Sequence, residues 1–141
     1  MPKSKKHNKI RKNKTRKCKP IKISSNFESG NIIHKSSKCD SKLNPIINLE
    51  IHEEPYPKFT KRKYKNWFYF KATNLKTRTK FHINNIRNYF NDWKGYTVCY
   101  SYNNKTWKRM KTRVNIEKKR LTWEINPKKS TIWFSFYPPY P

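Results

Sequence analysis

Short runs in which apolar and polar residues alternate recur from the middle of the chain to its end. In the segments 46–51 and 121–125, an aliphatic or aromatic residue occupies every second position. Side chains along a β-strand point to opposite faces in turn, so a period of two indicates a strand with one buried face. Both segments are therefore predicted to be strands of a half-buried sheet.

Further strands are predicted where aromatic and β-branched residues cluster. Residues 67–72 begin with aromatic side chains on both faces, which is typical of a strand that is covered on each side. Residues 84–93 have apolar positions at helical spacing, but their asparagine content favours a loop with one turn. The remaining predicted strands are residues 81–83, 95–102, 107–110 and 132–137, with a turn at Asn103 and Asn104.

These elements define the fold class and the division of the chain. About seven or eight short strands separated by turns, without a long amphipathic helix, predict an all-β antiparallel β-sandwich. Residues 1–20 contain one isoleucine and no aromatic residue, so they offer no apolar surface to offset the entropy of ordering. The predicted division is a disordered basic arm at 1–20 and a β-sandwich at 21–141.

The charge of the chain is strongly positive, with 35 Lys and Arg residues against 8 Asp and Glu. Ten of the basic residues lie in 1–19, and the rest of the chain still has 25 basic and 8 acidic residues, a net charge of +17. Such a field attracts polyanions, including nucleic acid and acidic protein segments. The abundance of Lys, Asn and Ile also fits AT-rich coding, although that bias does not explain the scarcity of acidic residues.

The candidate polyanion-binding residues belong to the arm and to two later basic segments. The arm is a candidate nuclear localisation signal or phosphate-binding arm, or else a solubilising extension. The basic segments 58–65 and 105–113 would add contacts next to exposed Tyr or Trp rings, on which bases can stack. The candidate residues are Lys5, Lys6, Lys9, Arg11, Lys12, Lys14, Arg16, Lys17, Lys61, Arg62, Lys63, Lys108 and Arg109.

Three cysteines, Cys18, Cys39 and Cys99, form no close pair in the sequence. An odd count without a Cys-x-x-Cys motif suggests neither a disulfide framework nor a zinc ribbon, so we expect reduced, intracellular thiols. Cys18, His34 and Cys39 match no standard zinc-finger spacing, and we expect no metal or other cofactor. Without a membrane-length apolar run or a secretory signal, we expect an intracellular protein, cytoplasmic or nuclear, that binds no membrane.

An ordered set of segments resembles a known family. The segments span residues 24–140 and include Trp67-Phe68-Tyr69-Phe70. They are residues 25–31, 67–70, 81–84, 95–96, 101–102, 107–109 and 132–140. In this order they resemble the N-terminal domain of the cytosolic carboxypeptidases. The resemblance implies a β-sandwich that stands, in that family, immediately before a zinc metallocarboxypeptidase domain, which trims glutamates from tubulin and other proteins with acidic tails.

The zinc site of that catalytic domain uses a His followed three residues later by Glu, together with a distant second His. This His-Glu spacing does not occur here, because the residues three positions after His7, His34, His52 and His82 are Ile10, Ser37, Pro55 and Asn85. Phosphate-binding glycine loops are excluded as well, because the sequence has glycine only at Gly30 and Gly95. We therefore expect that the chain is not an enzyme.

The expected function is a non-catalytic binding or accessory module that binds polyanionic partners through its basic surface and arm. Two alternatives remain: a nucleic-acid-binding protein that uses the arm, and a truncated or split part of a zinc carboxypeptidase whose catalytic domain is a separate chain. The segment 67–70 is expected to be core rather than contact surface. Gly30 and Asn31 are expected to form a turn with a positive φ, and Cys99 to be a buried thiol.

Overall fold

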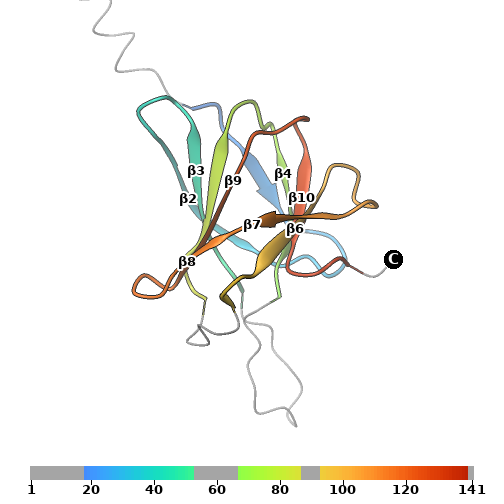
Figure 1. The fold of residues 1–141 in the computed structure, drawn as a ribbon. Helices are drawn as coiled ribbons and strands as arrows, with labels where there is room; N and C mark the ends of the chain where they lie inside the picture. Colours follow the sequence, from blue (N-terminus) through green and yellow to red (C-terminus); the bar gives the residue numbers. More distant parts are fainter. Residues whose placement is uncertain (1–17, 53–66, 87–92, 140–141) are drawn as a thin grey trace, which may run out of the picture.

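Two five-stranded β-sheets pack face to face in the computed structural model, which describes residues 18–52, 67–86 and 93–139 (Figure 1). The strand order is β1-β4-β10-β6-β7 in the first sheet and β2-β3-β5-β9-β8 in the second. The expected all-β sandwich is confirmed, while most of the predicted arm lies outside the described residues. The strands are β1 (Lys22–Ser24), β2 (Ile33–Cys39), β3 (Pro45–Glu50), β4 (Tyr69–Thr73), β5 (Thr79–Ile83), β6 (Thr97–Ser101), β7 (Lys108–Lys111), β8 (Arg113–Asn115), β9 (Arg120–Ile125) and β10 (Ile132–Ser135).

Seven of these strands lie where the sequence pattern predicts them, and β1, β2 and β8 do not. β1 and β8 have three residues each, and β2 is exposed along nearly its whole length. None of the three therefore shows the alternating apolar positions by which a strand is recognised in a sequence. In the ambiguous segment 84–93, residues 84–86 are a loop, Trp93 is buried, and 87–92 lie outside the described residues.

Among the described strands, one pair is parallel and the others are antiparallel. β3 and β5 run parallel, with Ile47 opposite Phe81 and Leu49 opposite Ile83. A parallel pair needs a long connection, and between these two strands the chain crosses to the first sheet, where it forms β4. The expectation of purely antiparallel pairing is corrected at this point.

An aromatic cluster forms the centre of the core between the sheets. Phe81 on β5 and Trp123 on β9 belong to the second sheet, and Phe134 on β10 belongs to the first. The ring centroids of Phe81 and Phe134 are 4.8 Å apart, and those of Trp123 and Phe134 are 5.4 Å apart. Phe68 and Phe70 pack against the same Trp123 ring from the first sheet. Because aromatic side chains bury large apolar areas, this cluster fixes how the two sheets face each other.

The structure joins Cys18 and Cys39 by a disulfide, with Cα atoms 5.8 Å apart, which is within the usual range. The expectation of three reduced thiols is therefore wrong for this pair. The two cysteines lie 21 residues apart in the sequence, and their proximity arises when β1 joins the first sheet and β2 the second. Cys99 is a free thiol and fully buried, which confirms its expected burial.

The loop that leads into the second sheet depends on a close backbone approach at Gly30. A Cβ at this position would overlap the carbonyl oxygen of Ser25 and lie 2.8 Å from its carbon. The positive φ falls on Ser29, at 65°, and not on Gly30. Asn31 is buried, and its amide donates hydrogen bonds to the carbonyls of His52 and Trp67, both at 2.9 Å. The expectation of a positive φ at Gly30 and Asn31 is therefore wrong. Gly30 is required by the close approach of the Ser25 backbone, and Asn31 is held by the hydrogen bonds of its side-chain amide.

Gly30→Ala should destabilise the fold by about 2 kcal/mol or more, because the new methyl group displaces backbone that cannot give way easily. Gly95→Ala is the matched control. Gly95 has a φ of 75°, but a Cβ there meets no atom within 4 Å, so the expected loss is about 1 kcal/mol from backbone strain alone. Urea unfolding of both variants measures the difference, and equal losses would contradict the close-approach explanation.

Candidate binding site

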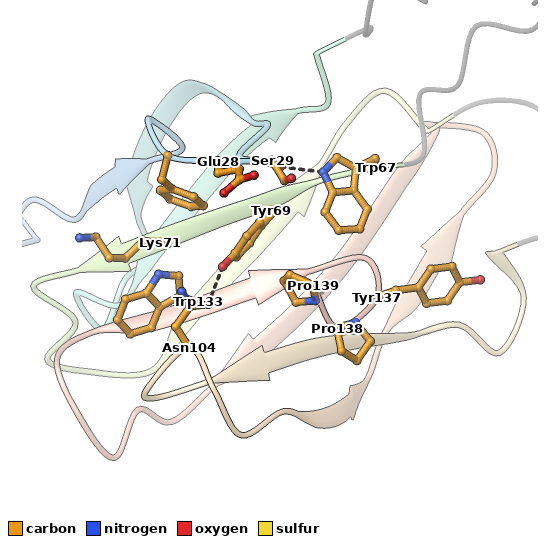
Figure 2. A pocket seen from close by; sticks show the side chains of 11 residues that line it. Glu28, Ser29, Trp67, Tyr69, Lys71, Asn104, Trp133, Tyr137, Pro138 and Pro139 are labelled. Carbon is orange, nitrogen blue, oxygen red and sulfur yellow. Dashed lines mark hydrogen bonds between the residues drawn. The ribbon is translucent and has the colours of Figure 1, made fainter. Parts of the chain in front are cut away.

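The outer face of the first sheet carries a groove with a volume of about 960 Å³ (Figure 2). We call it the aromatic groove. Its walls come from the loop at 27–29, from β4 and β10, from the β6–β7 loop and from the segment after β10. The residues that line it are Phe27, Glu28, Ser29, Trp67, Tyr69, Lys71, Asn104, Trp133, Tyr137, Pro138 and Pro139.

The alternation of side chains along β4 and the residues just before it supplies both the core and the floor of the groove. Phe68 and Phe70 are fully buried between the sheets. Trp67, Tyr69 and Lys71 point to the opposite face and line the groove (Figure 2). The expectation that the segment 67–70 is core is therefore confirmed for Phe68, Tyr69 and Phe70, which are buried, although Tyr69 also lines the groove. Trp67 is only partly buried and forms part of the groove surface.

Tyr69 is the central ring of this surface. Phe27, Trp67 and Trp107 pack edge-on against it, with ring centroids 4.8, 6.2 and 6.1 Å away. Its hydroxyl bonds to the side-chain oxygen of Asn104 at 2.5 Å, and the Trp67 indole donates to the Ser29 carbonyl at 2.7 Å (Figure 2). Because the polar atoms of Tyr69 and Trp67 are already engaged, these side chains are held in place. Tyr69 is 5% exposed, so it supports the surrounding rings more than it offers surface to a partner.

The groove holds one carboxylate, Glu28, and one ammonium group, Lys71. The Lys71 Nζ lies 5.8 Å from the centroid of the Trp133 ring, within the range of a cation–π interaction. In a chain of net charge +27, this hollow is thus close to neutral. Its charge therefore does not favour a polyanion.

The basic residues lie elsewhere. The described residues contain 20 Lys and Arg against 5 Asp and Glu. A continuous set of them follows β7 and β8, which are edge strands of the two sheets and are joined by a single residue (Figure 1). We call this set the basic edge; it comprises Lys108, Arg109, Lys111, Arg113, Lys118, Lys119 and Arg120.

Two of the predicted polyanion-binding residues, Lys108 and Arg109, belong to the basic edge and are exposed. The guanidinium of Arg109 lies 5.8 Å from the Tyr137 ring centroid, at the rim of the groove. The sequence prediction missed residues 118–120, which the turn between β8 and β9 brings to the same edge. The other candidates, Lys5, Lys6, Lys9, Arg11, Lys12, Lys14, Arg16, Lys17, Lys61, Arg62 and Lys63, lie outside the described residues.

His82 lies on the outer face of the second sheet, near several basic side chains. Its Nδ1 is hydrogen-bonded to the Thr122 hydroxyl at 2.7 Å. Burial, followed by the positive charges of Arg120, Lys80 and Arg113, lowers the pKa of His82 to about 4. Glu124 acts in the opposite direction but does not compensate the field. Burial is thus the main reason that the His82 ring stays neutral, and the three neighbouring cations add to this effect.

Glu124 is the acidic residue around which the basic side chains of this face gather. It lies 3.2 Å from Lys80, 3.3 Å from Arg113 and 3.6 Å from Arg78. Arg120 instead donates through Nε to the Asn84 side-chain oxygen at 2.6 Å, a bond to a neutral group that leaves its charge uncompensated. One carboxylate thus pairs with three cations, so the net charge of this group of side chains stays positive.

The part of the chain that the structure describes offers no cluster of three or more His, Cys, Asp or Glu residues able to hold a metal ion. Within the same residues, no helix has the length and apolar character that crossing a membrane requires. The expectations of no cofactor and no catalysis remain predictions.

The described residues thus combine a β-sandwich, a groove lined with aromatic rings and a basic edge. The family model of the cytosolic carboxypeptidase N-terminal domain matches residues 23–137. The chain belongs to this family, and the resemblance expected from the sequence is confirmed. Within the matched residues, the segments 25–31, 67–70 and 132–137 each contribute to the walls of the aromatic groove, although they lie far apart in the sequence.

Solved structures support the same assignment. The metallo-carboxypeptidase from Burkholderia cenocepacia is 25% identical and has a TM-score of 0.69 over 86% of this chain. The metallo-carboxypeptidase from Pseudomonas aeruginosa, in complex with (2-guanidinoethylmercapto)succinic acid, is 24% identical with a TM-score of 0.67 over 84% of this chain. The chain spans 30% of the length of each of these enzymes. No curated protein matches the chain.

Protonation of His82 should make the fold less stable in mild acid. Its pKa is about 4 in the folded state against 6.5 in the unfolded state, so its contribution is complete above pH 6.5 and is lost as the pH falls towards 4. Allowing for its partial exposure, the loss is about 1–2 kcal/mol. Urea unfolding at pH 7 and pH 4.5 measures it.

His82→Gln should remove this part of the pH dependence. His34→Gln is the matched control, because His34 is an exposed histidine on β2 of the same sheet. If both variants keep the full pH dependence, the assignment to His82 is wrong.

Proposed function

We propose that this domain is a non-catalytic binding module whose basic surface holds polyanionic partners, with acidic protein segments as the first class. The observation that carries the proposal is the basic edge, where seven basic residues of two sheets form one border of the sandwich. An extended acidic segment could follow this border and pair its carboxylates with successive Lys and Arg side chains. The acidic tails that the family's catalytic domains act on are partners of this kind.

Substitution within the basic edge tests this proposal. The double variant Lys108→Glu and Lys111→Glu reverses two exposed charges on β7. Its affinity for polyglutamate should fall by about tenfold or more, and the dependence of the affinity on salt should become weaker. Fluorescence anisotropy with labelled polyglutamate, titrated at several salt concentrations, measures both effects.

The matched control is Lys128→Glu with Lys129→Glu. These residues are also exposed and adjacent, but they follow β9 at the end opposite to the 116–119 turn. Equal losses in the two double variants would show that only the total charge matters. A wild-type affinity that does not respond to salt would contradict the proposal.

Nucleic acid is the alternative polyanion. Trp107 follows Lys105 in the β6–β7 connection. At the groove rim, the Arg109 guanidinium lies near the Tyr137 ring. An unstacked base could stack on either of the two rings, next to a positive charge. The same titration with single-stranded DNA and RNA separates the two classes. Tighter binding of the nucleic acids than of polyglutamate, lost in Trp107→Ala, would favour the alternative.

The aromatic groove favours a second function, docking of a zinc carboxypeptidase catalytic domain on the same chain or on a separate one. The groove is lined by several aromatic rings, has one carboxylate and one ammonium group, and lies within the residues that the family model matches apart from Pro138 and Pro139. In the relatives, the matched N-terminal domain is accompanied by the larger part of an enzyme. The family match ends at Tyr137, a residue that lines the groove. The rest of a carboxypeptidase would therefore begin beside it.

Loss of ring surface in the groove should weaken this docking. Trp133→Ala and Tyr137→Ala are each expected to reduce the affinity for the catalytic domain by about tenfold, as for central aromatic residues of other interfaces. The partner to use is the carboxypeptidase sequence encoded on the same or the neighbouring reading frame, and calorimetry gives the affinity.

Ile116→Ala provides the control for this experiment. Ile116 is 54% exposed, similar to Tyr137 at 53%, but it lies outside the groove. Its substitution should change the affinity less than about twofold. Comparable losses in all three variants would argue against docking at the groove.

A further inference from the structure

The aromatic groove and part of the basic edge lie on the same face of the first sheet. β4, β10, β6 and β7 are successive neighbours in this sheet. Their register aligns one row of residues across the four strands: Tyr69, Ser135, Cys99 and Arg109. Residues directly opposite each other on paired strands have their side chains on the same face. Because Tyr69 lines the groove, Arg109 points to the face that carries the groove.

The segment after β10 is fastened to this face and holds Tyr137 in place. The Ser135 hydroxyl donates to the Tyr137 carbonyl at 2.6 Å, and the Tyr96 hydroxyl donates to the Phe136 carbonyl, also at 2.6 Å. The Phe136 amide donates to the Phe68 carbonyl at 3.0 Å. Tyr137 itself is 53% exposed and lines the groove. It therefore offers ring surface from a position that the backbone fixes.

Arg109 is the cation at the junction of the two surfaces. Its guanidinium lies 5.8 Å from the Tyr137 ring centroid and donates through one nitrogen to the Thr97 carbonyl at 3.2 Å. A guanidinium has five N–H donors, so others remain for a carboxylate. The ion pairs among the described residues all involve Glu124, so none of them neutralises Arg109. Lys111, also exposed, shares this face because it lies two positions further along β7.

The partly exposed ring of Trp133 lies within reach of the same junction. β10 and β7 are separated only by β6, and the register offsets Trp133 from Arg109 by two residues along the strands. Strands lie about 4.8 Å apart and rise about 3.3 Å per residue, so the two positions are about 12 Å apart. An extended segment covers this distance in about four residues. One short peptide can therefore contact the cations and the rings together.

We propose that the outer face of the first sheet is a composite site for an extended acidic segment that carries an aromatic residue about four positions from its carboxylates. The carboxylates pair with Arg109 and Lys111, and the aromatic residue packs against Tyr137 and Trp133, since aromatic pairs gain more than their buried area alone. The inference rests on the proposed binding of acidic segments. It gives the groove to the same partner in place of a docked catalytic domain.

Three labelled peptides of equal length test this composite site on the full chain by fluorescence anisotropy. The Trp peptide has four glutamates, a Gly-Ser-Gly spacer and one tryptophan, and is made in both orders, of which the tighter binder is used. The Ala peptide replaces the tryptophan by alanine, and the Gln peptide replaces the glutamates by glutamine. The Trp peptide should bind about tenfold more tightly than either of the other two.

Substitutions in the protein assign each end of the peptide to its place. Trp133→Ala and Tyr137→Ala should each remove most of the advantage of the Trp peptide while changing the affinity for the Ala peptide less than about twofold. The unchanged binding of the Ala peptide also shows that these variants are folded. Arg109→Gln should weaken binding of the Trp and Ala peptides alike by several-fold. Ile116→Ala, an equally exposed residue outside the groove, is the control and should change neither affinity.

Spacer length tests the distance between the two ends. A spacer of twelve Gly and Ser residues should reduce the tenfold advantage to about twofold, because the effective concentration of the tryptophan at the groove falls. An advantage that does not depend on spacer length would overturn the assigned spacing.

The outcomes separate this inference from the proposed function. If the Ala peptide binds in a salt-dependent way but the Trp peptide binds no better, the composite site is overturned and the groove is left to a docked catalytic domain. If the Gln peptide binds as tightly as the Trp peptide, the groove takes an aromatic residue without help from the cations, which also overturns the composite site. If no peptide binds, the proposed function fails together with the inference.

Discussion

Aromatic packing between the two sheets is the constraint on which the rest of this structure depends. Phe81, Trp123 and Phe134 close the space between the sheets, and Phe68 and Phe70 complete the cluster. Side chains of a strand alternate between its faces, so burial of these two phenylalanines sends the residues beside them outward. Core packing therefore determines which side chains of β4 and of the residues just before it line the aromatic groove.

The basic edge and the aromatic groove are adjacent surfaces that differ in charge, and they meet where the Arg109 guanidinium lies 5.8 Å from the Tyr137 ring centroid. The groove contains one carboxylate and one ammonium group, whereas the basic edge collects positive charge where the two sheets meet. Mutual repulsion among these cations opposes folding, and Glu124 offsets part of it at Arg113. The same carboxylate also pairs with Lys80 and Arg78, which lie outside the basic edge.

The surface disulfide joins the residues just before β1 to the last residue of β2, and neither cysteine belongs to the hydrophobic core. Cys99, in contrast, is fully buried on β6. The difference follows from the fold, because β2 is an exposed edge strand whereas β6 lies between two other strands of its sheet.

The sequence by itself determined most of the fold and the family. Strands such as β3, β5 and β9 alternate apolar and polar residues strongly enough to be recognised, because one face of each is buried. β2 has no such signal, since its place is set by pairing with β3 and not by its own side chains. Only the tertiary structure showed that Trp67 and Tyr69 face a groove while Phe68 and Phe70 face the core, that residues 118–120 join the basic edge, and that Cys18 meets Cys39. Each of these facts is a contact between distant parts of the chain, and a local pattern carries no information about which distant segment will arrive beside it.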